Sequence, residues 1–302
     1  MLAGRASRSY NDASMGFFAS IDGSVVPAGE ARVSVLDNGF TFGDSVYETL
    51  RTYGGRPFEL TRHLRRLRAS AGRLAIDIPL GNDALKGRLD ALLARAGNPE
   101  SYIRMIVTRG VGDISYHFER VQGPTIVMAV KPFEPLPDED YRNGVRAALV
   151  SVRRNAPGAL DPAIKSCNLL NNILAVREAQ ARGAVEALML NAAGEVAEGA
   201  SSNVFVVKGG VVRTPPLDAG ILAGITREVL LELSVGVGVP AREESLSTED
   251  LLAADEVFIT SSLKEMTPVT DVDGHRVGDG RPGPVTRRLL QAFREYAPRH
   301  CE

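Results

Sequence analysis

The stretch Lys131-Pro132-Phe133-Glu134-Pro135-Leu136-Pro137 places three prolines in its last six residues. Proline stiffens a connection and continues neither a helix interior nor a central strand, so this stretch predicts a linker between domains. We therefore expect a small N-terminal domain over 1–131, a proline-rich linker at 132–137 and a larger C-terminal domain over 138–302. The length of 302 residues also favours two domains.

Before the linker, the sequence predicts a strand-rich half with two helices. Leu64, Leu67, Ala71 and Leu74 recur at spacings of three and four, which is typical of an amphipathic helix. The expected helices cover 61–74 and about 82–96, and the second ends at Gly97-Asn98-Pro99. The expected strands cover 16–36 with a turn at Asp22-Gly23, Phe40–Tyr53 up to the turn Gly54-Gly55, Tyr102–Thr108 and Pro124–Val130.

After the linker, strands and helices follow one another without a regular βαβ rhythm. The expected strands lie at 144–152, 185–190, 203–207, 256–260 and 268–273, with a hairpin turn at Gly209-Gly210. The expected helices lie at about 168–182, 226–235, 248–253 and 284–296. We therefore expect an α+β protein rather than a doubly wound sheet.

The composition excludes several classes of protein. Hydrophobic residues make up 44% and charged residues 24% of the chain, as in an average soluble globular protein. The net charge is -2, without long runs of one sign, so neither nucleic acid nor an anionic membrane is expected as a partner. Only two cysteines occur, and we find neither an apolar run of membrane-spanning length nor a secretory signal. We expect a soluble, cytoplasmic protein without a disulfide framework.

Several common catalytic signatures are absent. The chain has no Walker loop, dinucleotide fingerprint, HExxH, CxxC or GxSxG motif. Its four histidines are scattered, so we expect no metal site.

Lysine is rare in this chain, because only five of the 35 basic residues are lysines. Arginine cannot lose its proton or form a Schiff base, whereas lysine can. Lys165 lies in Asp161-Pro162-Ala163-Ile164-Lys165-Ser166-Cys167-Asn168-Leu169-Leu170, at an expected strand-to-helix junction. Desolvation there would lower the pKa of Lys165 and favour the neutral, nucleophilic amine. A lysine whose ammonium reaches the surface is the alternative interpretation.

Two further segments combine glycine with small hydroxyl residues. The first of them is Gly194-Glu195-Val196-Ala197-Glu198-Gly199-Ala200-Ser201-Ser202-Asn203-Val204-Phe205. If Glu198 is buried there, its carboxylate requires a cationic partner. An ordinary hairpin with solvated glutamates is the alternative there. The second segment is Gly220-Ile221-Leu222-Ala223-Gly224-Ile225-Thr226-Arg227-Glu228, which contains an expected helix start. Backbone N–H groups and the Thr226 hydroxyl there would form an anion-binding site. Any capped helix has the same pattern.

The last segment of interest joins Gly39-Phe40-Thr41-Phe42-Gly43-Asp44-Ser45-Val46-Tyr47-Glu48-Thr49-Leu50-Arg51 to His63-Leu64-Arg65-Arg66-Leu67. Arg66 stands next to the apolar stripe of the expected helix, a position that suits a phosphate clamp. A salt-bridged helix arginine is the alternative.

Taken together and in this order, the four segments resemble the class IV aminotransferases, pyridoxal-phosphate enzymes of fold type IV. The resemblance extends from about Gly16 to Phe293. It implies an α+β fold of two domains with pyridoxal 5'-phosphate between them, in a homodimer. It also implies an amino acid and a 2-oxo acid as small-molecule substrates.

The resemblance implies roles for individual residues. Lys165 is similar to the catalytic Schiff-base lysine, and Glu198 to the carboxylate that holds the pyridine nitrogen protonated. The residues that resemble the phosphate cup are Arg66, Ile225, Thr226 and Ser262, and Ser201 is a further cofactor-binding candidate. The substrate-binding candidates are Tyr47, Tyr102, Arg104 and Ser261.

The substrate signatures of the family are mixed in this chain. Branched-chain enzymes usually carry Phe-Glu-Gly-x-Arg and a tyrosine after the asparagine that follows the lysine, and both marks are broken at 47–51 and at Leu169. Tyr102-Ile103-Arg104 nevertheless matches their substrate-carboxylate segment. Three stretches look closer to the D-amino-acid enzymes, namely Lys165-Ser166-x-Asn168-Leu169-Leu170, Val46-Tyr47-Glu48 and Thr260-Ser261-Ser262. The Arg-x-His pair of those enzymes falls here on Ile114-Ser115-Tyr116.

We therefore expect a transaminase that moves an amino group between an amino acid and a 2-oxo acid such as 2-oxoglutarate. D-amino acids are the favoured substrates, with the carboxylate bound by Arg104 or another arginine. The alternatives are a branched-chain L-amino-acid aminotransferase, an aminodeoxychorismate lyase, an (R)-amine transaminase, and a catalytically silent dimer that binds cofactor or a partner protein. Residues 110–120 are expected to form a loop over the site, within reach of the neighbouring subunit.

Overall fold

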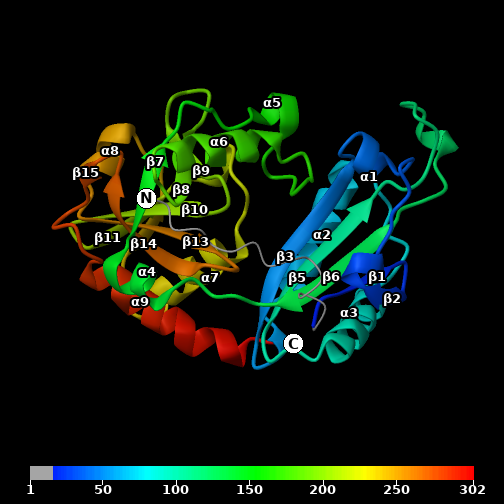
Figure 1. Ribbon diagram of the computed structural model, residues 1–302. Helices are drawn as coiled ribbons and strands as arrows, with labels where there is room; N and C mark the ends of the chain where they lie inside the picture. The colour runs from blue at the N-terminus through cyan, green and yellow to red at the C-terminus, as the bar shows by residue number, and fades with distance from the viewer. Residues whose placement is uncertain (1–15) are drawn as a thin grey trace. The chain divides into compact units, whose positions relative to one another are not determined.

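The computed structural model describes residues 16–302 (Figure 1). The prediction that the chain starts without a secretory signal falls mainly on residues 1–15, which lie outside the described residues. Contacts along the chain define two compact units. Unit 1 extends to Glu134, and unit 2 is Pro135–His300. Cys301–Glu302 belong to the first unit, whereas the predicted C-terminal domain included them. The reason is local, because the Glu302 N–H donates to the Pro57 carbonyl at 2.9 Å.

Within residues 16–134, the strands form one antiparallel sheet of six, in the order β2-β1-β6-β5-β3-β4. Their bounds are β1 Phe18–Ile21, β2 Ser24–Pro27, β3 Ser45–Tyr53, β4 Arg56–Pro57, β5 Ser101–Thr108 and β6 Ile126–Pro132. Along β5, residues alternate between fully and half-buried, as expected where one face of a sheet packs on a core. The other face is therefore accessible to solvent or to a ligand.

The helices of unit 1 pack on this sheet, and two of them lie where the apolar periodicity predicted helices. They are α1 Asn38–Thr41, α2 Leu60–Arg73 and α3 Asn82–Ala96. Helix α2 buries Leu60, Leu64 and Leu67 along one stripe. Helix α3 ends at Gly97, whose φ of +63° is the left-handed conformation that glycine adopts at low cost. Both predicted helices are thus confirmed.

Two predictions for unit 1 were wrong. The segment 32–36 is not a strand, since its residues are all exposed and no strand pairs with it. Strand β3 begins at Ser45 rather than at Phe40, because Asp37 caps the short helix α1 through the Gly39 N–H at 2.8 Å. Alternation alone does not make a strand when the segment has no partner for its backbone hydrogen bonds.

Within residues 135–300, nine strands form one mixed sheet. Eight of them follow the order β12-β11-β10-β13-β14-β7-β8-β9, and β15 pairs with β14 outside this order. Their bounds are β7 Val145–Leu149, β8 Glu186–Leu190, β9 Val196–Gly199, β10 Asn203–Lys208, β11 Val211–Thr214, β12 Ala241–Glu243, β13 Glu256–Ser261, β14 Glu265–Val272 and β15 His275–Arg276. Three pairs are parallel, namely β11 with β12, β14 with β7, and β7 with β8. The mixture of strand directions and unevenly placed helices confirms the α+β class.

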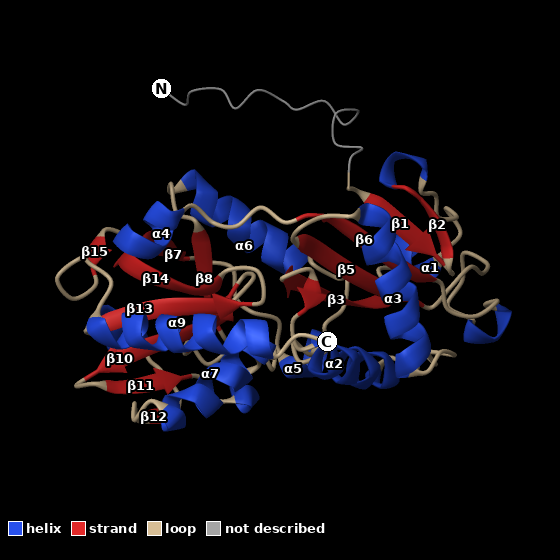
Figure 2. Cartoon of the chain, turned by 90° about the horizontal axis from the view of Figure 1, so that it is seen from below, coloured by secondary structure: helices blue, strands red, loops and turns tan. Residues whose placement is uncertain are grey.

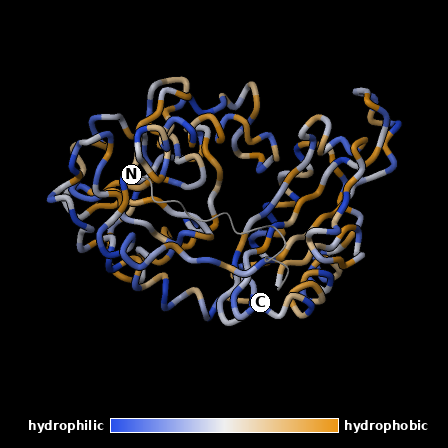
Figure 3. Tube along the Cα trace, viewed as in Figure 1, coloured by the Kyte–Doolittle hydropathy of each residue, from blue (hydrophilic) through white to orange (hydrophobic). Residues whose placement is uncertain are grey.

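The helices of unit 2 cover different parts of this sheet. They are α4 Asp138–Asn143, α5 Pro157–Leu160, α6 Leu170–Ala181, α7 Ile225–Gly236, α8 Thr248–Leu252 and α9 Pro284–Tyr296. Helices α7 and α9 lie side by side over β13, whereas α6 packs on β8 (Figure 2). Along α9 the hydropathy colour alternates between blue and orange (Figure 3), and the buried positions include Leu289 and Phe293.

The core of unit 2 is built mainly from aliphatic residues of the central strands. One buried cluster joins β7, β8, β10, β13 and β14, and it includes Leu188, Val206, Ile259 and Val269. The strands expected from the sequence did not include β9, β12 or β15, which are four residues long or shorter, and strand β11 was implied only by the hairpin turn before it. No helix within residues 16–302 combines the length and the apolar character needed to cross a membrane.

Candidate active site

The eleven predicted site residues divide between the two units. Unit 2 holds Lys165, Glu198, Ser201, Ile225, Thr226, Ser261 and Ser262, and unit 1 holds Tyr47, Arg66, Tyr102 and Arg104.

Glu198 is a buried carboxylate on β9, with 4% of its surface exposed. Arg154 Nε donates to Oε1 at 2.7 Å, and the Leu222 N–H donates to Oε2 at 3.0 Å. Burial raises the pKa of Glu198 above its ordinary value, and the charges of Arg154 and Lys165 and the Leu222 N–H oppose this rise. The cationic partner that a buried Glu198 required is therefore Arg154.

Sequence reasoning did not find Arg154. Its side chain is 10% exposed, and Nη1 also donates to Asn171 Oδ1 at 3.1 Å. The Arg154 N–H donates to the Leu190 carbonyl at 2.9 Å, which holds this residue beside the end of β8. Arg154 and Glu198 are 44 positions apart. The only signal in the sequence was a pair of arginines, Arg153-Arg154, following an apolar strand.

Lys165 lies half-buried in an irregular segment between α5 and α6. The predicted strand-to-helix junction was wrong, because the short helix α5 separates β7 from this segment. The Ala163 N–H donates to Asp161 Oδ1 at 2.8 Å, and the Ser166 N–H to the Ile164 carbonyl at 2.8 Å. These turns hold the chain on both sides of Lys165, and its charge reaches Glu198.

The N-terminus of α7 has the features of an anion seat. Ile225 and Thr226 begin the helix, both are buried, and no side chain caps the first turn. The Thr226 hydroxyl is buried without a hydrogen-bond partner among the described residues. A buried hydroxyl and uncapped helix N–H groups are unfavourable unless something accepts their hydrogen bonds. An oxyanion would satisfy both.

Asn203 connects Glu198 to this helix terminus. Its Nδ2 donates to the Leu222 carbonyl at 3.0 Å and lies 3.4 Å from Glu198 Oε2. A Cβ on Gly224 would lie 1.9 Å from Asn203 Oδ1, so only glycine allows this approach at the start of α7. Asn203 also pairs with Thr260 across β10 and β13. The sequence placed Asn203 inside a motif but gave it no role.

Ser261 is the last residue of β13, and Ser262 begins the turn that follows it. Both side chains are half-buried, and Ser261 Oγ accepts a hydrogen bond from the Lys264 N–H at 3.2 Å. The hydroxyl of Thr260, one residue earlier, is buried without a partner among the described residues. Through the pairing of Thr260 with Asn203, the structure brings this turn beside the Glu198 group.

Unit 1 contains a second buried carboxylate, Glu48 on β3. Arg66 Nε and Nη2 each donate to it at 2.7 Å, and His63 Nδ1 lies 2.7 Å from Oε2. Burial by itself would raise the pKa of Glu48, but the charge and hydrogen bonds of Arg66, together with His63, hold it well below its ordinary value. Both Glu48 and His63 are fully buried. Arg66 thus has the salt bridge of the alternative interpretation, and its binding of phosphate stays a prediction.

Tyr47, Tyr102 and Arg104 lie on the accessible face of the unit 1 sheet. All three are half-buried, while their neighbours along β3 and β5 are fully buried. The guanidinium of Arg104 lies 4.1 Å from the centre of the Tyr47 ring. This stacking keeps a cation and an aromatic ring together on a surface that a small anionic molecule could reach.

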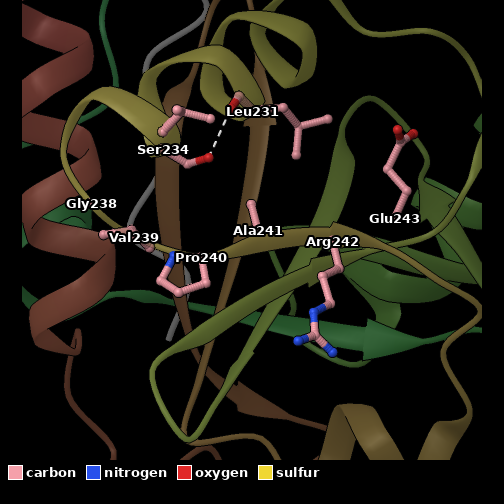
Figure 4. A pocket seen from close by; sticks show the side chains of 9 residues that line it. Leu231, Ser234, Gly238, Val239, Pro240, Ala241, Arg242 and Glu243 are labelled. Atoms are coloured by element: carbon pink, nitrogen blue, oxygen red, sulfur yellow. Dashed lines mark hydrogen bonds between the residues drawn. The ribbon is translucent and has the colours of Figure 1, made fainter.

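A groove of about 550 Å³ lies elsewhere in unit 2, between the end of α7 and β12 (Figure 4). Leu231, Val235, Pro240 and Arg242 are among its lining residues. No predicted site residue lines it, so we do not assign the active site to this groove.

Comparison with known proteins identifies the class. The family model described as amino-transferase class IV matches residues 45–272. The chain belongs to this family, so it is an enzyme of the aminotransferase class.

Relatives within the family carry two different activities in their names. A protein of Methanocaldococcus jannaschii, whose name proposes a branched-chain-amino-acid aminotransferase, is 41% identical over 91% of this chain and 94% of its own length. The D-alanine aminotransferase of Staphylococcus haemolyticus is 38% identical over 91% of this chain and 96% of its own.

The fold is also that of solved aminotransferases. The structure of the branched-chain amino acid aminotransferase from Thermobaculum terrenum, solved in its PLP-form, matches with a TM-score of 0.84 at 28% identity, covering 94% of each chain. The predicted fold type IV is thereby confirmed.

Proposed function

We propose that this enzyme is a pyridoxal-phosphate-dependent transaminase that exchanges amino groups between an amino acid and 2-oxoglutarate, with D-amino acids preferred. The observation that carries the proposal is the connection made by Asn203. It joins a buried carboxylate, Glu198, to an uncapped helix terminus with an unpartnered hydroxyl, Thr226.

The described residues of unit 2 fit the two ends of pyridoxal phosphate. The first turn of α7 and Thr226 offer donors to a phosphate, and neither is satisfied within the described chain. Glu198 can accept a hydrogen bond from a protonated ring nitrogen, since an ionised carboxylate has about four acceptor sites and Arg154, Leu222 and Asn203 occupy three of them. Lys165 supplies the primary amine required for attachment.

When bound, pyridoxal phosphate supplies a ring that accepts electrons from the substrate Cα. An ionised Glu198 would stabilise a positive charge on the ring nitrogen. Lys165 Nζ takes the proton from the substrate Cα as general base and returns it as general acid. By the family resemblance, Arg66 would bind the phosphate, and Tyr47 and Arg104 would bind the substrate.

Two observations support a D-amino-acid preference. The stretches around Lys165, Tyr47 and Ser261 resemble the D-amino-acid enzymes, and D-alanine aminotransferases are among the relatives at 36–38% identity. A branched-chain L-amino-acid activity is the second candidate. It is favoured by Arg104 on the accessible face of β5 and by the name of the Methanocaldococcus jannaschii relative.

The test of the proposal is a half-reaction on the purified, cofactor-loaded protein. Its absorbance spectrum is followed after separate additions of D-alanine, D-glutamate, L-leucine and L-glutamate. We expect conversion of the bound cofactor to its amine form by the D-isomers. Conversion by the L-isomers alone would replace the D-preference with the branched-chain activity. No conversion by any of the four would favour the lyase, an amine substrate or a binding-only protein.

Replacement of Arg104 by alanine should weaken 2-oxoglutarate binding by roughly tenfold to a hundredfold, because a desolvated carboxylate loses its charged donor. The measurement is the Michaelis constant for 2-oxoglutarate. Arg146→Ala is a matched control, since Arg146 is an exposed arginine whose ion pair with Asp271 spans 3.4 Å. Unchanged affinity in Arg104→Ala would exclude Arg104 as the carboxylate ligand.

Replacement of Arg154 by methionine should shift the acid limb of the pH–rate profile to higher pH, by about one unit or more. Burial raises the pKa of Glu198 and Arg154 opposes the rise, so loss of Arg154 raises this pKa further. Glu198 then becomes protonated, and inactive, at a higher pH than in the parent enzyme. A profile that keeps its acid limb would show that Glu198 need not be ionised. Arg146→Met again serves as the control.

The proposal includes a homodimer. Unit 1 exposes three large apolar side chains, Val35 at 71%, Phe40 at 70% and Tyr116 at 83%, and burial of such side chains against a second subunit would stabilise a dimer. The Gly112 N–H donates to the Leu36 carbonyl at 3.2 Å, which joins the segment before α1 to the loop 110–120 (Figure 1). These contacts support the prediction that this loop reaches a second subunit.

Light scattering should give twice the chain mass of 32.3 kDa. Phe40→Asp should lower the measured mass toward that of one chain, because a charge would be buried at the interface. Val235→Asp, at an 81% exposed site in unit 2, should leave the mass unchanged. A parent protein that scatters as a monomer would refute the homodimer.

A further inference from the structure

A second lysine of unit 2 is held inside an ion pair beside the proposed site. Lys264 lies in the turn between β13 and β14, and its Nζ donates to Glu186 Oε2 at 2.8 Å and to Ser201 Oγ at 2.9 Å. The Lys264 side chain is 22% exposed, whereas Glu186 on β8 is 1% exposed. The group therefore combines three elements that are distant in the sequence.

The Glu186 carboxylate is fully engaged by donors. Its Oε2 accepts from the hydroxyls of Ser201 at 3.0 Å and Ser202 at 3.1 Å, in addition to Lys264. Its Oε1 accepts from the Ala187 N–H at 3.2 Å. A buried carboxylate with a cation and three further donors is satisfied without a ligand.

These partners determine where the hydroxyl proton of Ser201 points. An ionised carboxylate only accepts hydrogen bonds, and an ammonium only donates them. Ser201 must therefore donate its single proton to Glu186 and accept from Lys264. One lone pair of the Ser201 oxygen remains, and Ser201 is itself exposed. The hydroxyl has no proton left for an oxyanion of a ligand.

The ion pair is built against the strand that carries Glu198. Gly199 follows Glu198 directly, and a Cβ at Gly199 would lie 2.2 Å from Ser202 Oγ. The main chain of Lys264 is also fixed, since its carbonyl accepts from Tyr141 Oη at 3.1 Å and Thr267 Oγ1 at 3.1 Å. Movement of the ion pair would therefore disturb the loop that joins Glu198 to Asn203.

We propose that Lys264 is a positioning residue of the active site, which acts through Ser201 by holding its hydroxyl as a hydrogen-bond acceptor toward the bound ligand. The ligand group that meets Ser201 is then a donor, such as an N–H or O–H group, and not an oxyanion. This inference rests on the proposed cofactor site. Without the ammonium, Glu186 is an uncompensated buried charge, and the Ser201 hydroxyl loses the donor that fixes its orientation.

The test is a double-mutant cycle on the affinity of the cofactor-free protein for pyridoxal phosphate, followed by absorbance. We expect Lys264→Met and Ser201→Ala each to raise the dissociation constant about tenfold. The double variant should match Ser201→Ala within about twofold, because Lys264 acts through that hydroxyl. Lys264→Arg should recover most of the parent affinity.

The control is Lys208→Met, which removes a lysine of the same unit from an exposed ion pair with Asp255 at 2.9 Å. It should retain the parent affinity. Glu186→Gln with Lys264→Met removes both charges at once, so no charge is left uncompensated if Lys264→Met alone does not fold. This pair should show the same tenfold loss.

Three results would overturn the inference: parent affinity in Lys264→Met, additive losses in the double variant, or an equal loss in Lys208→Met. A parent protein that gives no absorbance change with pyridoxal phosphate contradicts the proposed function itself. The two failures are therefore distinguishable.

Discussion

Lys165→Ala is expected to lower the rate of amino-group transfer by about 10³-fold to 10⁴-fold. General acid–base catalysis by a positioned side chain contributes up to about this factor, and the variant also loses the amine that attaches the cofactor. The measurement is the single-turnover rate with D-alanine. Arginine in place of Lys165 should restore little activity, because a guanidinium does not lose its proton.

The control for Lys165→Ala is Lys208→Ala, an exposed lysine of the same unit whose loss should leave the rate unchanged. Thermal unfolding of both variants separates loss of chemistry from loss of fold. Lys165 is half-buried in a turn segment, so we expect the melting temperature of the cofactor-free Lys165→Ala protein to stay near that of the parent. A Lys165→Ala enzyme with parent activity would contradict both the catalytic role and the proposed chemistry.

The parts of the fold that could be predicted from the sequence are those specified by neighbouring residues. The helix over 82–96 has its apolar stripe and its stop at Gly97 within one short stretch, and the structure ends α3 there. The segment 32–36 alternates as a strand should, yet no neighbouring strand offers it hydrogen bonds. A strand needs a partner segment for its backbone hydrogen bonds, and the alternation within one segment does not show that such a partner exists.

In the candidate site too, the features set by distant residues could not be predicted from the sequence. The need of Glu198 for a cation could be predicted from the cost of burying a charge, but the identity of Arg154 could not, since 44 positions separate the two. His63 and Glu48 both stood in quoted motifs, and their contact at 2.7 Å depends on how α2 packs on β3. Residue types indicate which chemistry a site requires, whereas the fold decides which side chains provide it.

Glu48→Gln is expected to lower the free energy of unfolding by about 3–5 kcal/mol, because removing one partner of a buried ion pair leaves the other charge uncompensated. Arg66 and His63 would then face a neutral amide at a fully buried position. The measurement is urea-induced unfolding of the cofactor-free protein. The matched control is Asp90→Asn in the same unit, whose exposed pair with Lys86 should contribute less than about 1 kcal/mol.

The pH dependence of this contribution has a definite sign. Because the folded protein holds the pKa of Glu48 well below its ordinary value, the stabilisation by Glu48 is present above that ordinary value. It is lost as the pH falls below the ordinary value toward the lower, folded-state pKa. The difference in stability between the parent and Glu48→Gln should therefore be largest near neutral pH and should shrink in acid. A difference that stays constant down to pH values far below the ordinary pKa of glutamate would show that Glu48 stabilises unit 1 by packing rather than by charge.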